Sequence, residues 1–307
     1  MDYFHIVTQM LMLFGIVLVG YLSARRGLWA ADMNRRMSVF VLNVTAPCLI
    51  LGSVMGDGLV FERAEIVQLM LVSVLNYVIL IGGAYAVTAI WRLDAYRRGL
   101  LRFMLSFGNV TFIGFPVLAA IFGERAVFYG AVLTIPFNVL IFTIGVEFVR
   151  GGGQLWRAFR PRLVFSPCVI ASLGAVVLAL LKAETPAPVA EWFHLLGDMT
   201  IPCALLIIGS SLTAVPVRAM AGNRFVYTVA VLKLLVLPLV VLVAFRLLGM
   251  GGYVTSVAVV LSAMPVAANG IMFCLKYGRD ERLMAQGIFL TTLLSVGSIP
   301  LVAMLCV

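Results

Sequence analysis

The sequence has little charge and few of the side chains that support acid–base or metal chemistry. Charged residues occupy 11% of its 307 positions, and there are two histidines, His5 and His194, each near the start of an apolar segment. No His-Glu-x-x-His motif and no intramembrane aspartate pair accompanies them. The five cysteines stand singly, without metal-type spacing, which is typical of small packing residues. These absences argue against an enzyme and predict no bound metal and no cofactor.

Apolar residues, in contrast, are abundant. They make up 63% of the chain, and the mean hydropathy of +1.11 exceeds what a soluble core requires. Runs of about 17 to 25 apolar residues can each cross a bilayer as a helix. The sequence therefore predicts an all-α membrane protein with ten transmembrane helices, at about 5–24, 37–55, 66–90, 100–121, 126–148, 163–182, 193–213, 225–247, 254–276 and 283–306.

The basic residues give an orientation. Seventeen of the 22 Lys and Arg residues fall in the loops after the odd-numbered segments, and only four in loops and ends on the other side. By the positive-inside rule, both termini lie outside a plasma membrane, the inner membrane of a bacterium. The net charge of +9 is thus explained by topology, and we expect no nucleic-acid partner.

Five segments per half place the two halves in the membrane with opposite orientation, as in an inverted repeat. A short repeated motif supports this division, because Thr45-Ala46-Pro47-Cys48 is matched 155 positions later by Thr200-Ile201-Pro202-Cys203. The sequence predicts an N-terminal repeat at 1–150, a cytoplasmic linker at 151–162 and a C-terminal repeat at 163–307.

The fourth segment of each half is interrupted by Asn, Gly and Pro. Proline removes a backbone donor and displaces the carbonyl one turn earlier, so a lipid-buried helix must break there. Interrupted helices at matching positions of two repeats indicate a transporter binding site, although one such helix alone would indicate only a kink. The expected helix-breaking residues are Gly114, Pro116, Pro265 and Gly270.

Each break leaves helix ends near the membrane centre, and N–H groups at half-helix starts can hold an anion. Asn109 and Asn269 would add side-chain amides that donate to a carboxylate. Thr111 belongs to the same interrupted stretch, and Asn43 and Asn138 each lie beside a helix-breaking proline. We expect these five residues to line a substrate path, with interhelical hydrogen bonds as the alternative for Asn43 and Asn138.

Lys233 lies about nine positions into the eighth segment, roughly 13 Å deep at 1.5 Å per residue. An ionisable group at that depth faces protein or a water-filled cavity, near a partner or a substrate. Two interpretations remain open. Its charge meets an anionic substrate, or it braces the broken helices by donating to their carbonyl ends.

No carboxylate lies at mid-membrane, where a cation antiporter would be expected to keep one. Glu147 and Asp198 lie near segment ends, and Asp57 and Glu124 lie in outer loops. The absence of a core carboxylate therefore favours an anionic substrate. Moving one charge through 100 mV involves about 2.3 kcal/mol, so the potential alone can drive anion export. We expect uniport or export, with proton coupling as an open alternative.

These residues resemble the auxin efflux carrier family of bacterial and plant transporters. The resemblance covers nearly the whole chain and rests on Asn109 to Pro116, on Met264 to Asn269 and on Lys276-Tyr277-Gly278-Arg279-Asp280. It implies a scaffold of helices one, two, six and seven, and a transport unit of helices three to five and eight to ten, whose broken helices four and nine cross at the substrate. It also implies a homodimer. The long central loop of the plant hormone carriers is missing, and the compact bacterial members look like carriers of malonate or malate.

The sequence as a whole predicts a carrier of small organic mono- or dicarboxylates that works by alternating access, as the transport unit moves against the scaffold. Two alternatives stay open. One is a sodium-coupled symporter of larger amphipathic anions on a similar crossed-helix fold, and the other is a membrane receptor that keeps the fold without transport.

Overall fold

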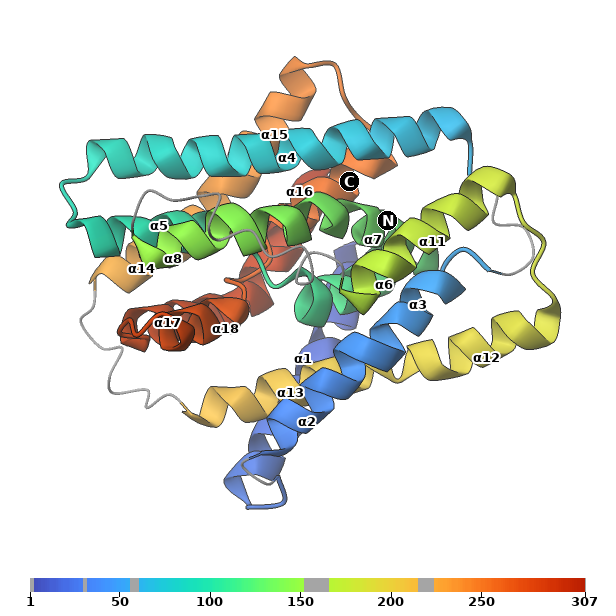
Figure 1. Ribbon diagram of the computed structural model, residues 1–307, viewed down its shortest axis with the longest axis horizontal. Helices are drawn as coiled ribbons and strands as arrows, with labels where there is room; N and C mark the ends of the chain where they lie inside the picture. Colours follow the sequence, from blue (N-terminus) through green and yellow to red (C-terminus); the bar gives the residue numbers. More distant parts are fainter. Residues whose placement is uncertain (1–2, 30–31, 56–60, 152–165, 215–223, 307) are drawn as a thin grey trace. The chain divides into compact units, whose positions relative to one another are not determined.

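A computed structural model of the chain is built from helices (Figure 1). It describes residues 3–29, 32–55, 61–151, 166–214 and 224–306, so the expected linker at 151–162 lies outside the described residues apart from position 151. Within these ranges there is no strand, only an isolated antiparallel bridge between Gly108 and Val266. The chain separates into two compact units, and each is described by itself.

Unit 1 comprises Met1–Leu71, Thr111–Ile135 and Phe165–Ala214. It contains α1 (Tyr3–Arg25), α2 (Met33–Phe40), η1 (Val41–Thr45), α3 (Ala46–Gly52), the start of α4 (Arg63–Ile90), most of η2 (Val110–Gly114), α6 (Phe115–Phe122), most of α7 (Glu124–Leu140), α11 (Pro167–Leu181), α12 (Ala187–Asp198), α13 (Thr200–Ser211) and η4 (Leu212–Ala214).

Glycines bring α1 and α13 into backbone contact within unit 1. A methyl group added to Gly209 would lie 1.9 Å from the carbonyl oxygen of Val17, and one added to Gly20 would lie 2.4 Å from that of Leu206. Only glycine permits this approach, which is how small residues pack membrane helices together. Gly20 and Gly209 therefore serve helix packing.

Unit 2 comprises Val72–Val110, Pro136–Val164 and Val215–Val307. It contains the rest of α4 and α7, together with α5 (Ala95–Ser106), η3 (Ile141–Gly145), α8 (Val146–Arg150), α14 (Arg224–Val231), η6 (Leu232–Val236), α15 (Leu237–Leu247), α16 (Tyr253–Ser262), α17 (Asn269–Lys276) and α18 (Arg282–Cys306). Its core holds an aromatic cluster in which Phe103 contacts Phe107 and Phe273, and Phe107 contacts Phe137.

Capping residues set several helix ends. The Asp94 side chain accepts a hydrogen bond from the backbone N–H of Arg97 at 2.9 Å and starts α5. Ser166 caps α11 in the same way, with Pro167 as the first helical residue. Gly151, with φ of +74°, ends α8 in the left-handed conformation that favours glycine.

Three prolines lie directly beyond π-helical turns. Pro47 follows η1, Pro116 follows η2 and Pro238 follows η6, and each is the second residue of the next α-helix. A π turn widens the helix by one residue, which makes room for the ring and for the carbonyl that loses its donor. These prolines therefore lie in continuous helical chain.

Six described helices are long and apolar enough to cross a membrane, which supports the all-helical membrane class. They are Ile6–Arg25, Arg63–Ile90, Glu124–Arg150, Ala187–Ser211, Arg224–Leu247 and Arg282–Cys306. The other four expected segments contain shorter helices in the described chain, and the segments at 100–121 and 254–276 are interrupted. The ten-helix inverted repeat stays a prediction.

Candidate functional site

The two interrupted segments meet in unit 2. Between α5 and η2 the chain is extended at residues 107–109, and between α16 and α17 it is non-helical at residues 263–268. The Asn109 N–H donates to the Pro265 carbonyl at 2.7 Å, and the Ala267 N–H donates to the Phe107 carbonyl at 3.0 Å. Backbone that leaves a helix inside a membrane must find partners within the protein, and here each interruption supplies them for the other.

Small and polar side chains allow this pairing. A methyl group added to Gly108 would lie 3.1 Å from the Met264 Cβ, so the two interrupted segments are already in close contact. The Val266 N–H donates to the Thr291 hydroxyl oxygen at 3.1 Å, and that hydroxyl donates to the Gly287 carbonyl at 2.7 Å. Helix α18 thus supports the irregular backbone from one side.

Both predicted asparagines lie where helix resumes after an interruption. Asn109 directly precedes η2 and is 9% exposed, whereas Asn269 is the first residue of α17 and is half-buried. A helix start carries a partial positive charge, and here the Val110 N–H donates to the Gly108 carbonyl at 3.0 Å and the Gly270 N–H to the Ala267 carbonyl at 3.1 Å. Gly270 packs tightly beside Asn269, because an added methyl group would lie 2.5 Å from the Met284 Sδ.

Lys233 reaches the same interruption from η6. Its side chain is completely buried, and its Nζ donates to the Leu105 carbonyl at 3.2 Å, in the last turn of α5. The added methyl group at Gly108 would lie 3.6 Å from this Nζ. A helix C-terminus carries a partial negative charge that favours a cation. The bracing contact expected as one of two roles is therefore present.

The remaining predicted residues have separate surroundings. In unit 1, Asn43 is exposed and its amide donates to the Val39 carbonyl at 2.6 Å, one turn earlier in its own helix. Thr111 is half-buried in η2. In unit 2, Asn138 is half-buried in α7, two residues beyond Pro136.

The helix-breaking residues divide into two kinds. Pro265 lies within the non-helical chain and Gly270 lies just beyond it, in α17. Gly114 and Pro116 are buried in unit 1, and the helix continues through both of them. The interruption of the fourth segment lies at 107–109 instead, because the π turn of η2 accommodates Pro116 and the extended pairing with 265–267 determines where α5 ends.

Two residues of this site were not singled out from the sequence. Ser106 is the last residue of α5, and its hydroxyl is buried with no hydrogen-bond partner in the described structure. Thr291 lies in α18, where the pair Thr291-Thr292 interrupts an otherwise apolar run. That polar pair is the signal that could have drawn attention to it.

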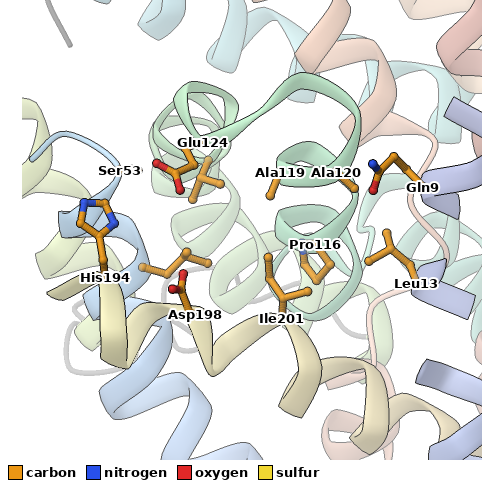
Figure 2. A pocket seen from close by; sticks show the side chains of 12 residues that line it. Gln9, Leu13, Ser53, Pro116, Ala119, Ala120, Glu124, His194, Asp198 and Ile201 are labelled. Carbon is orange, nitrogen blue, oxygen red and sulfur yellow. The ribbon is translucent and has the colours of Figure 1, made fainter. Parts of the chain in front are cut away.

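Unit 1 contains a cavity of about 320 Å³. Its polar lining includes Glu124 and Asp198, which are exposed, and His194, which is half-buried. Figure 2 shows these three on one side of the cavity and Gln9 and Leu13 on the other, with Pro116 of α6 between them. No group of three or more metal-binding side chains occurs in the part of the chain that the structure describes. Two carboxylates make this cavity unfavourable for an anion.

The fold and the paired interruptions define an integral membrane protein with a polar centre in one unit. Comparison with known proteins identifies the class. The family model described as "Membrane transport protein" matches residues 5–158 and 154–303. The chain belongs to this family of transporters, which includes the auxin efflux carriers, and is not an enzyme.

Several relatives align over most of the chain. A protein of Rhizobium meliloti named "Putative malonate transporter" is 23% identical over 295 residues, 93% of this chain and 91% of that protein. An uncharacterized transporter of Methanothermobacter thermautotrophicus is 27% identical over 297 residues, 93% of each. Auxin efflux carrier component 1 of Arabidopsis thaliana is 24% identical over 147 residues, 47% of this chain and 23% of the plant protein.

Proposed function

We propose that the protein carries small organic anions, mono- or dicarboxylates, across the membrane by alternating access. The observation that supports this most is the joining of two interrupted segments in unit 2, where Asn109 and Asn269 lie at the starts of half-helices. The substrate carboxylate would bind to the side-chain amides at these starts, where the helix ends add a partial positive charge. The relative named for malonate agrees with an anion of this size.

The charges of unit 2 agree with an anionic substrate. Lys233 brings a positive charge to the interruption, and its recorded hydrogen bond in the described chain is to a carbonyl, not to a carboxylate. A bound carboxylate would supply the negative charge that this buried ammonium otherwise lacks.

The rest of the arrangement follows from the sequence pattern and from the family. The distribution of basic loops supports a plasma-membrane location with both termini outside. Movement of a transport unit against a scaffold and assembly as a homodimer are the expectations that membership of the family brings to this chain.

Flux measurements test the proposal. The purified protein is reconstituted into proteoliposomes and given radiolabelled malonate, malate, succinate and pyruvate, with and without sodium. We expect at least one of these anions to enter in a saturable way, with little dependence on sodium. Absence of flux for all four would contradict a carrier of small carboxylates, binding without flux would favour a receptor, and strict sodium dependence would favour the cation-coupled alternative.

The site itself is tested by the variants Asn109→Ala and Asn269→Ala. Hydrogen bonds to a charged group contribute about 1.5–3 kcal/mol each, so each variant should lose roughly tenfold to a hundredfold in anion affinity. Asn43→Ala is the matched control, because its amide bonds only within its own helix and is exposed. Unchanged ligand binding in both site variants, with melting temperatures like that of the native protein, would place the substrate elsewhere.

A further inference from the structure

Lys233 is a buried cation that lacks a fixed anionic partner. Its Nζ can donate three hydrogen bonds, and the structure gives it one, to the Leu105 carbonyl at 3.2 Å. The side chain is 0% exposed. An ammonium in this setting is costly to keep charged unless something negative lies beside it.

The neighbouring elements supply no such anion. Helices α5, α14, α15 and α18 pack against η6, and their charged residues are all arginines. Each of these arginines has a partner elsewhere or is exposed. Arg97 pairs with Asp94 and Arg282 with Asp280. Arg98 donates to the Leu93 carbonyl, Arg102 to the Thr88 hydroxyl and Arg246 to the Leu305 carbonyl, and Arg224 is exposed. The tyrosines have other surroundings too, because Tyr96 donates to the Asp280 carbonyl and Tyr227 is exposed. No carboxylate on these helices therefore faces Lys233 within the described residues.

Proton binding and anion binding at this place must favour each other. A carboxylate that enters beside Nζ lowers the free energy of the charged ammonium, and by linkage the charged ammonium binds the carboxylate more tightly. When the anion leaves, a charged ammonium again lacks a negative partner. A carrier whose empty state holds a neutral amine avoids moving an unpaired charge as it returns.

We propose that Lys233 is the proton-carrying group of the transport cycle. The lone pair of the amine takes one proton from water on the side where the anion binds, and this N–H bond breaks again when the anion is released on the other side. No other covalent bond changes. One proton therefore moves with each anion, so that a monocarboxylate crosses without net charge and a dicarboxylate crosses with one negative charge. This inference rests on the proposed carriage of small anions, and it names the coupled ion.

Lysine and arginine differ in the property that matters here. Arginine stays protonated at any pH a protein meets, whereas lysine can give up its proton when buried. Lys233→Arg therefore keeps the positive charge and the donor to the Leu105 carbonyl, but it cannot release a proton. A lysine that only braced the interruption would tolerate this change, whereas a proton carrier would not.

The experiment follows anion and proton together in proteoliposomes that contain a pH-sensitive dye, using radiolabelled malonate, malate, succinate and pyruvate. The native protein should carry one proton with each anion, and an inward proton gradient should accelerate net uptake. In Lys233→Arg, net uptake should fall at least tenfold and lose its proton, while exchange of external for internal anion, which needs no empty return, should keep at least a third of the native rate. Lys182→Arg, the same substitution at an exposed position, is the control.

The possible outcomes are distinct. Anion flux without proton movement in the native protein would overturn the proton-carrying role and leave the carrier function standing, whether or not the variant folds. Native proton coupling that persists in a folded Lys233→Arg protein would assign the proton to another group. Absence of flux for all four anions in the native protein would overturn the carrier function, and the coupling with it.

Discussion

The charged groups near the unit 1 cavity and near the unit 2 interruptions differ in sign and in burial. Unit 1 has a cavity of about 320 Å³ with two exposed carboxylates, Glu124 and Asp198. Unit 2 has a completely buried ammonium, that of Lys233, beside two interrupted helices. Exposed charges are solvated and screened by salt, whereas a buried charge depends on whatever binds beside it. If an anion binds in unit 2 as proposed, the sign and burial of charge locate its site better than the volume of a cavity does.

The largest effect is expected when the paired backbone of unit 2 is disturbed. In Gly108→Val, the new side chain would collide with Met264, whose Cβ lies 3.1 Å from the first added carbon. Overpacking of this kind costs about 1–3 kcal/mol, and we expect a lower melting temperature together with loss of anion flux. Gly82→Val is the control, because nothing lies within 4 Å of its added carbon. Native flux in Gly108→Val would show that the pairing is not needed for transport.

The second change removes the buried charge. Lys233→Met should lower anion affinity by roughly tenfold to a hundredfold, as expected when a charge-assisted contact worth about 1.5–3 kcal/mol is lost. The melting temperature should change little, because an apolar side chain of similar length fills the buried position and offsets the lost bond to the Leu105 carbonyl. Thermal shift with and without malonate measures both quantities. Matching losses of stability and affinity would mean that Lys233 mainly braces the interruption.

The smallest effect is expected in unit 1. The double variant Glu124→Gln with Asp198→Asn removes both carboxylates from the cavity, and we expect anion affinity to change less than about threefold, since exposed charges are solvated and screened by salt. The same binding titration measures it. A change larger than that of Lys233→Met would place the binding site in the cavity of unit 1.

The sequence predicted the helical membrane class and the interruptions because both depend on local composition. Asn109, Pro265 and Asn269 stand out against apolar neighbours, and the structure places all three at or beside non-helical chain. The exact break in the fourth segment was not predictable from Pro116, because a π turn can accommodate a proline and only pairing with the distant residues 265–267 determines where α5 ends.

The remaining contacts could be identified only in the folded chain. The depth of Lys233 indicated a buried partner, but the Leu105 carbonyl lies 128 positions away in the sequence and no local pattern points to it. Asn43 shows the opposite case, since its amide satisfies a carbonyl four residues earlier. The cavity of unit 1 is lined from α1, α3, α6, α7, α12 and α13, and a surface assembled from so many elements leaves no periodic signal.

The backbone contact between α1 and α13 fixes the distance between these two helices. At Gly20 and Gly209, the two helices lie too close for even a methyl group to fit between them, so neither can slide along the other without collision. A pair of spin labels attached to the outward faces of these helices should report one narrow distance in every state of the protein. Label pairs placed elsewhere can then be calibrated against it, and any broadening or second peak they show can be assigned to motion of the labelled element itself.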